Sequence, residues 1–149
     1  AQTPPGHSGM GTTLSANALS LAAMRATLEQ VMTPAAYAHM EALAAQLAAG
    51  LQDVVDQYEV PWHVVRVGAR VEFICAPGPL HNGTEAEAAH APALERAIHI
   101  ALLNRGCLIA PFHNMMLVSP ATTPAQVEKL VQAFESVVAS LALDLGSWQ

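Results

Sequence analysis

The sequence predicts an α+β fold, in which N-terminal helices precede a small, mainly antiparallel sheet that is packed by helices. Apolar residues recur at three- and four-residue spacing in residues 21–54 and 127–141, as on one face of a helix. Residues 63–76 instead alternate between apolar and polar side chains, as strands do. The expected order of helix, helix, strand, strand, helix, strand, strand, helix suits a sheet with helices on one face.

The N-terminal elements follow from spacing and from proline. We expect an irregular arm over residues 1–13, a helix over residues 14–33, and a C-terminal domain over residues 34–149. Thr33 and Pro34 suit an N-cap followed by proline at the first helical position. This second helix is expected to run to about Gln57, with one apolar face made of Met40, Leu43, Leu47, Leu51 and Val54.

The strand region leaves two readings open. Gly68 and Ala69 separate two strand-like runs, which suits either a hairpin or one continuous strand bent at Gly68. The alternation places five residues in one apolar set: Val65, Val67, Val71, Phe73 and Cys75.

The C-terminal half begins with Thr84-Glu85-Ala86-Glu87, a capping-box pattern that predicts one helix continuing through Leu102 to a cap at Gly106. Residues 107–110 and 115–118 are expected to form two short strands. A second capping box starts at Thr123 and opens the last helix. The apolar face of that helix is Val127, Leu130, Val131, Phe134, Val138 and Leu141.

Composition excludes some classes of protein and favours others. Hydrophobic residues make up 52% of the chain and charged residues 12%, against about 25% charged residues in typical domains. We therefore expect part of the surface to be buried, either by more of the same protein or by a second subunit. An alanine-rich composition bias is the alternative.

The net charge and the cysteines indicate which partners and which cellular compartment to expect. The net charge of -6 argues against nucleic acid. Neither a membrane span nor a signal peptide is expected, since the chain has no apolar run of about 18 residues and residues 1–10 lack the required pattern. Cys75 and Cys107 are expected to be free and buried in the reducing cytoplasm.

The most informative stretch runs from Gly11 to Ser20, where a turn rich in small and hydroxyl residues leads into a helix. Backbone N–H groups and hydroxyls at a helix N-terminus suit a phosphate. Thr13 is the first candidate for that contact and Thr12 the second; a plain N-cap cluster is the alternative.

The remaining candidates are charged side chains and histidines. Arg70 lies in an apolar strand, where its charge needs a partner. That partner is either a substrate carboxylate or Glu72, and an outward-facing surface position is the third reading. We expect no metal site, because His81, His90 and His99 are nine residues apart and would alternate between helix faces.

Four segments together resemble class III aminotransferases, most of all the glutamate-1-semialdehyde aminomutase branch. The turn around Thr13 resembles the Gly-Thr-(Leu/Phe)-Ser-Gly-Asn-Pro-Leu segment of that family. Gly78-Pro79-Leu80-His81-Asn82 resembles its Gly-Pro-Val-His-Asn loop. Arg105-Gly106 with the following residues 108–111 resembles its (Gln/Arg)-Gly-(Ile/Val)-Tyr-Leu-Ala-Pro strand, and Thr123 stands where its last helix begins.

The resemblance implies the C-terminal domain of a fold type I enzyme that depends on pyridoxal 5'-phosphate (PLP) and transfers amino groups. It also implies a homodimer in which Thr13 contacts the cofactor phosphate of the neighbouring subunit. Such an enzyme needs a lysine before this segment to hold PLP, whereas the one lysine of this sequence is Lys129, beside Glu128. We therefore expect no catalytic residue in the chain, which would be inactive without the rest of the polypeptide.

Departures from the family pattern bear on the substrate. Met115 stands where many class III enzymes carry an arginine for a substrate carboxylate, and Asn114 stands where the aminomutase branch has an acidic residue. Aminomutase activity and ordinary transamination, with a bulky or apolar amino donor, both remain open, as do the acceptor and the stereochemistry. The rival reading is a stand-alone, non-catalytic α+β module that binds a partner or a ligand.

Overall fold

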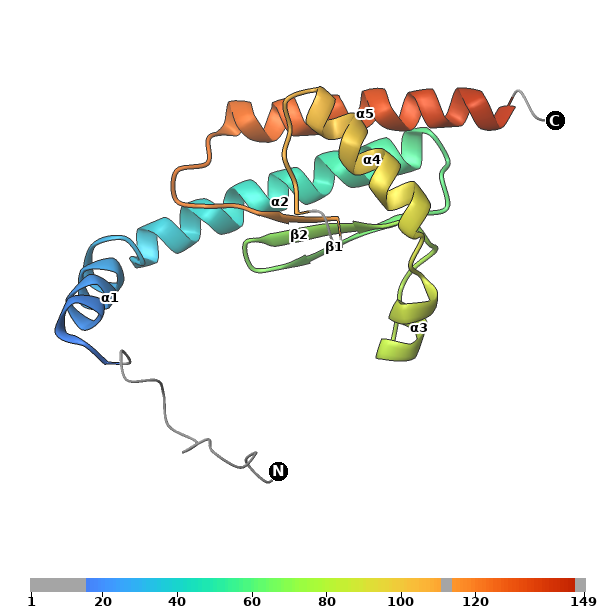
Figure 1. Cartoon of the computed structure of the whole chain (residues 1–149). Coiled ribbons are helices and arrows are strands. Elements are labelled where there is room, and N and C mark those ends of the chain that lie inside the picture. Colours follow the sequence, from blue (N-terminus) through green and yellow to red (C-terminus); the bar gives the residue numbers. More distant parts are fainter. Residues whose placement is uncertain (1–15, 111–113, 147–149) are drawn as a thin grey trace. The chain divides into compact units, whose positions relative to one another are not determined.

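The computed structural model describes residues 16–110 and 114–146. The chain divides into two compact units, residues 1–36 and residues 37–149. The first unit holds α1 (Ala18–Gln30) and the first residues of α2 (Pro34–Gln57); the second holds all later elements (Figure 1).

Helix α1 forms where the sequence predicts a helix. The side chain of Asn17 accepts a hydrogen bond from Ser20 N at 3.0 Å and so caps the first turn. No residue of α1 is buried, and its apolar stripe, Leu21, Met24 and Leu28, is exposed.

Helix α2 begins and ends as expected. Thr33 Oγ1 accepts a hydrogen bond from Ala36 N at 3.2 Å, ahead of Pro34 at the first helical position. The five residues of the predicted apolar face are all buried, together with Ala44 and Val55.

The strand region is a hairpin of β1 (His63–Val67) and β2 (Arg70–Ile74), whose turn has Gly68 at φ 56°. The predicted single apolar set is wrong. The two-residue turn pairs Val67 with Arg70 and Val65 with Glu72, so Val65 and Val67 lie on the face opposite Val71 and Phe73.

The expected long helix from Thr84 is two helices, α3 (Gly83–Ala88) and α4 (Pro92–Asn104). The N-cap of α3 is Asn82 rather than Thr84, because its side chain accepts from Glu85 N at 3.0 Å. The break falls at Ala91, because a residue before proline is disfavoured in the helical region. Gly106, at φ 74°, ends α4 as predicted.

The last part holds β3 (Met115–Leu117) and α5 (Pro124–Gly146). Thr123 and Gln126 form the predicted capping box, with Gln126 Oε1 2.9 Å from Thr123 N. Residues 107–110 do not form the expected strand; Ala110 N donates one bond to Met115 O at 3.0 Å. The proline that follows Ala110 has no N–H with which to extend a ladder.

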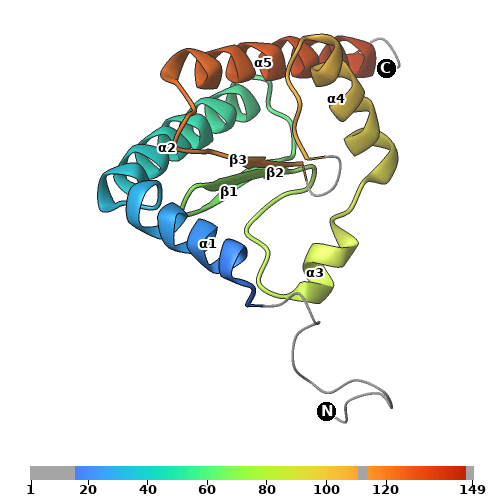
Figure 2. The same ribbon diagram turned by 60° about the vertical axis from the view of Figure 1, so that its left-hand side comes forward.

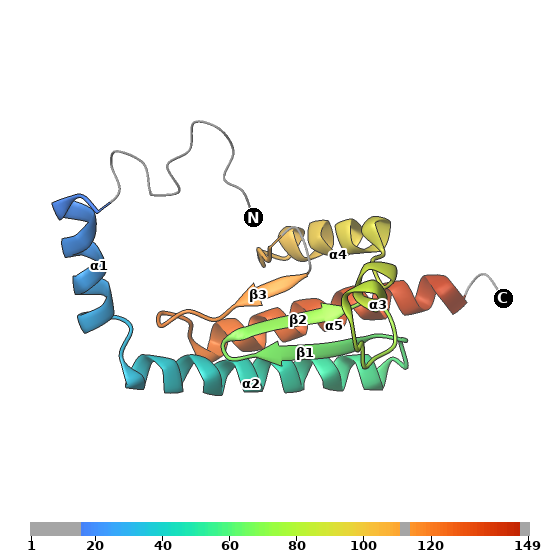
Figure 3. The same ribbon diagram turned by 90° about the horizontal axis from the view of Figure 1, so that it is seen from below.

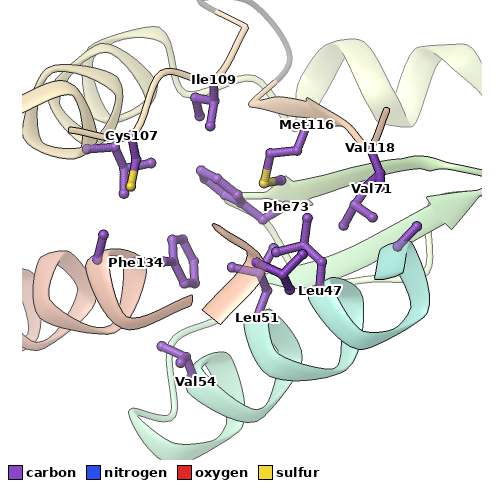
Figure 4. Packing of buried hydrophobic residues seen from close by; sticks show 14 of the residues in the cluster. Leu47, Leu51, Val54, Val71, Phe73, Cys107, Ile109, Met116, Val118 and Phe134 are labelled. Carbon is purple, nitrogen blue, oxygen red and sulfur yellow. The ribbon is translucent and has the colours of Figure 1, made fainter. Parts of the chain in front are cut away.

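The second unit has two layers, as the predicted fold class requires. The antiparallel sheet has the order β1-β2-β3, and α2 and α5 cover one face of it (Figure 2). Between the layers lies a core that includes Leu47, Leu51, Val71, Met116 and the aromatic pair Phe73 and Phe134 (Figure 4).

Both cysteines are free, as expected. Cys107 belongs to the core, whereas Cys75 is only half-buried.

Candidate functional site

The candidate phosphate-binding residues Thr12 and Thr13 lie outside the described residues, which begin at the end of their turn. Ala16 there has φ 58°, a left-handed conformation that favours glycine. Ala18 occupies the first helical position, where proline fits. The glycine and proline that the resembled family segment carries at these two places therefore suit the backbone of this chain.

The N-terminus of α1 is partly satisfied by its own cap. Asn17 takes the Ser20 N–H, and the Asn17 side-chain amide donates to Ser20 Oγ at 2.8 Å. A phosphate near this helix would therefore depend on hydroxyl and N–H groups of the preceding turn.

The face of the sheet turned away from α2 and α5, which we call the outer face, is seen in Figure 3. The strand register forms two cross-strand rows on it. The first row is Val67, Arg70 and Leu117; the second is Val65, Glu72 and Met115. Arg70 and Met115, both predicted as substrate residues, therefore share this face.

Arg70 is paired with Glu72, one of the alternatives open at the level of sequence. Its Nη2 lies 2.7 Å from Glu72 Oε2, and the two side chains are 47% and 15% exposed. Residues two apart on a strand point to the same face, and β2 is held by neighbours on both sides. The backbone of Arg70 is thus held in the central strand, and its guanidinium is held by Glu72.

Asn114, the third predicted substrate residue, is buried. It has φ 43°, and its Nδ2 donates to Phe73 O at 3.4 Å. This contact ties the start of β3 to β2.

The Gly-Pro-Leu-His-Asn loop that carries part of the family resemblance borders the outer face. The ring of His63 lies so close to Gly78 that an added Cβ would be 2.5 Å from it, and His63 Nδ1 lies 2.7 Å from Ala76 O. The loop, β1 and Ile74 of β2 enclose a hollow of about 620 Å³, whose apolar walls include Val65, Pro79 and Leu80.

A second, smaller hollow of about 240 Å³ adjoins the first, since both include Ile74 and Leu80. Glu72, Glu87 and Glu95 line it. Glu95 caps α4 through Ala91 N at 3.0 Å and lies 3.6 Å from His90 Nδ1. Burial first, and the charge of Glu95 second, raise the pKa of the Cys75 thiol to about 12.

Within residues 16–110 and 114–146, no three His, Cys, Asp or Glu side chains are grouped as metal ligands would be. No helix of the described part is long and apolar enough to cross a membrane.

Glu72 and Glu95, which line the smaller hollow, are not among the site residues that the sequence predicts; Glu72 is predicted only as a possible partner of Arg70. Its position two residues from Arg70 on one strand was a usable signal, whereas the approach of α4 to β2 could not be read from local spacing.

Comparisons with known proteins show which proteins share this sequence and fold. No family model matches the chain. It is 31% identical over 131 residues to glutamate-1-semialdehyde 2,1-aminomutase of Thermomicrobium roseum, covering 87% of the chain and 30% of the relative. To an enzyme of the same name from Thermus thermophilus it is 36% identical over 123 residues, covering 81% and 29%.

Solved structures of related enzymes have the same fold as this chain. The chain superimposes on a glutamate-1-semialdehyde aminomutase of Pseudomonas aeruginosa, in complex with PMP, with a TM-score of 0.85 and 45% identity, covering 93% of this chain and 31% of that one. A β-phenylalanine aminotransferase of Variovorax paradoxus shares the fold, with a TM-score of 0.79 at 22% identity, covering 88% and 30%.

The fold and the sequence together show that this chain belongs to the PLP-dependent aminotransferase family and corresponds to a C-terminal part of such an enzyme. Within that family, its relatives named above at 31–45% identity are glutamate-1-semialdehyde aminomutases. The chain spans about 30% of the length of the curated relatives it matches.

Proposed function

We propose that the complete protein is a cytoplasmic class III aminotransferase that moves an amino group from an amino donor to a keto acid or aldehyde. In this proposal the present chain supplies one wall of the substrate pocket. The support is that Arg70 and Met115 share the outer face of the sheet, and that the Gly-Pro-Leu-His-Asn loop borders a hollow beside Val65 and Ile74 of the same sheet. Residues of β1, β2 and the loop thus border one hollow, as a pocket wall requires.

The cofactor-binding lysine would lie outside this chain. Lys129, the one lysine of the sequence, is on α5, and its Nζ donates to Gly106 O at 3.4 Å beside the end of α4. Bound PLP would supply the electron sink that allows a proton to leave the substrate carbon. The chain alone would then be inactive.

Thr13 is the proposed phosphate ligand, with Thr12 beside it, and the contact would reach the cofactor of the partner subunit. The described end of the turn supports this, because Ala16 and Ala18 have conformations that suit the family's glycine and proline. A homodimer with sites at the subunit boundary follows from the proposal.

A mixed-dimer experiment tests the contact in trans. One subunit of the complete protein carries Thr13→Ala, and the other lacks its cofactor-binding lysine. If Thr13 serves the partner's site, the mixed dimer keeps one intact site, with about half the PLP and activity per dimer of the wild type. If Thr13 serves its own subunit, mixing restores nothing, and the proposed contact in trans is wrong.

The matched control is Thr27→Ala. Thr27 lies on α1, where its hydroxyl bonds only within the helix, to Ala23 O at 2.9 Å, among the described residues. In homodimers, Thr13→Ala should weaken PLP binding by about tenfold or more, as the loss of a charge-assisted hydrogen bond does, whereas Thr27→Ala should leave it unchanged. Equal effects would indicate a structural cause.

Aminomutase activity and transamination of a bulky or apolar amino donor both fit this proposal. The apolar walls of the larger hollow favour an apolar group there. The stand-alone binding module is not favoured, because relatives that are enzymes match 81–87% of this chain.

A further inference from the structure

His63 lies at the end of the hairpin opposite its turn, where the outer face is hollowed. By register it pairs with Ile74, so these two residues form a third row on the outer face, beside the row of Val65 and Glu72. Both residues of this row line the larger hollow, together with the Gly-Pro-Leu-His-Asn loop. The ring of His63 is therefore a polar group at the wall of an otherwise largely apolar hollow.

The hydrogen bond from His63 to the backbone before this loop determines what the rest of its ring can do. Ala76 O, 2.7 Å from Nδ1, can only accept, so Nδ1 carries the proton. In the neutral ring, Nε2 then has a lone pair and acts as an acceptor. No described residue bonds to Nε2. It is also not buried, because the one buried side-chain nitrogen or oxygen without a partner in the described ranges is His99 Nδ1.

The loop holds this acceptor in place. The ring of His63 lies against Gly78, where an added Cβ would be 2.5 Å from Cγ and 2.6 Å from Cδ2. At the other end of the loop, Glu85 accepts hydrogen bonds from His81 N at 2.6 Å and from Asn82 Nδ2 at 2.7 Å. Because both ends of the loop are tied down, the hollow and its acceptor are formed before a ligand arrives, which lowers the cost of binding.

The walls of the larger hollow determine which ligand group fits. Among the described residues that line it, none is Asp, Glu, Lys or Arg, so a charged group would lose its hydration without gaining an ion pair. A purely apolar group would suit the walls, but it would cover Nε2 of His63 and leave it without a hydrogen bond. The best fit is an apolar group that carries one neutral O–H or N–H donor.

We propose that His63 selects the amino donor by its side chain. Nε2 accepts a hydrogen bond from a neutral O–H or N–H group, which the side chain carries on an apolar stem into the larger hollow. The inference rests on the proposed function and names a class of amino donor for it. His63 determines specificity, and no step of the amino transfer passes through it.

The test uses the complete, PLP-loaded protein and two probes of similar shape. Phenol has an O–H donor, whereas anisole, its methyl ether, has none. NMR titration gives the dissociation constant of each probe. With the histidine nitrogens isotopically labelled, phenol should shift the Nε2 resonance of His63 more than anisole does. That resonance is identified by its loss in His63→Asn.

His63→Asn is the main variant. The asparagine amide can still donate to Ala76 O, but it is too short to place an acceptor where Nε2 lies. The variant should raise the dissociation constant of phenol about two- to tenfold relative to that of anisole, as the loss of one hydrogen bond does. His63→Gln has a longer amide with an acceptor oxygen and should restore phenol binding in part.

His39→Asn is the matched control. The ring of His39 also contacts a backbone carbonyl, with Nε2 2.9 Å from Thr122 O, but it lines neither hollow. Its replacement should change neither dissociation constant. In the wild type, phenol should also compete with the amino donor, so that KM rises while kcat stays the same.

The outcomes separate this inference from the proposed function. Absence of PLP absorbance in the wild type, or of reaction with any amino donor, would refute the proposed function itself. Where both are present, any one of the following results overturns the inference alone: no binding of phenol, the same ratio of phenol to anisole binding in wild type and His63→Asn, an equal change of that ratio in His39→Asn, or a KM that phenol leaves unchanged.

Discussion

Phe134 of α5 packs against Phe73 of β2 in the core between helix and sheet. It is fully buried, and its ring centroid lies 4.8 Å from that of Phe73 and 6.3 Å from that of Trp62. Pairs of rings at such separations add to the energy of burial. The stability of the second unit should therefore depend on this side chain.

Phe134→Ala should lower the free energy of unfolding by about 3–5 kcal/mol, because it removes buried surface and leaves a cavity. Urea denaturation measures the change. Leu108→Ala is the control: Leu108 is 77% exposed, and surface replacements stay within about 0.5 kcal/mol. Equal losses in the two variants would contradict the described packing.

Cys75 should be inert at neutral pH. Burial, and then the charge of Glu95, raise the thiol pKa from 9.0 to about 12, and only the thiolate reacts. In a Cys107→Ser background, alkylation of the folded protein should stay slow up to about pH 10, well below the raised pKa. Alkylation in urea should instead rise near pH 9.0, the unshifted pKa of this thiol.

The same shift fixes the sign of the pH effect on stability. The folded-state pKa is raised, so the contribution of the neutral thiol is fully present below pH 9.0 and is lost as the pH rises towards about 12. Fast alkylation of the folded protein near pH 9.0 would contradict the raised pKa of Cys75.

At the scale of elements, the packing of α2 on α5 depends on Gly50. A Cβ added there would lie 2.9 Å from Cγ2 of Val131, closer than van der Waals contact. The stiff, branched valine has little freedom to move aside. Glycine is thus required by the neighbouring helix, against its poor helix propensity.

Gly50→Ala should therefore destabilise the protein by about 1 kcal/mol, since overpacking outweighs the gain in helix propensity. In a Val131→Ala background the clash is gone, and the same change should become stabilising by up to about 1 kcal/mol. Denaturation of the four proteins of this cycle measures the coupling. A change of the same sign in both backgrounds would contradict the contact.

The elements also show where local rules suffice. Asn17, Thr33 and Thr123 cap the helices that follow them, and proline divides the predicted helix at Ala91. Capping and the proline effect act within a few residues. The helix break could therefore be predicted from Pro92, whereas the capping-box pattern at Thr84 predicts one longer helix that does not form.

At the scale of the whole molecule, apolar surface is the dominant feature. Val67, Leu108 and Leu117 are largely exposed, as is the stripe of α1 that contains Met24, and charged residues are only 12% of the chain. Exposed apolar patches favour association. This agrees with the expectation that more protein covers part of this surface.

The 149-residue chain alone should self-associate through the α1 stripe, and light scattering should show its mass rising with concentration. Met24→Glu places a charge on the stripe and should reduce association. Gln30→Glu adds the same charge at an exposed position outside the predicted stripe and should have less effect. A monodisperse monomer at high concentration would contradict the prediction.

Much of the molecule followed from the sequence by itself. The apolar spacing determined the buried face of α2, and alternation indicated the strands, because each pattern repeats within a few residues. The identity of Arg70 and Met115 as candidates also came from sequence, although the pocket role of both stays a proposal.

Only the tertiary structure decided how these pieces face one another. The two-residue turn at Gly68 reversed the face expected for Val65 and Val67, because one step in register moves every side chain to the other side of a sheet. The same register brought Arg70, Glu72 and Met115 onto one open surface, while the approach of α4 set Glu95 beside Cys75. Such contacts join residues distant in the chain, and no local period encodes them.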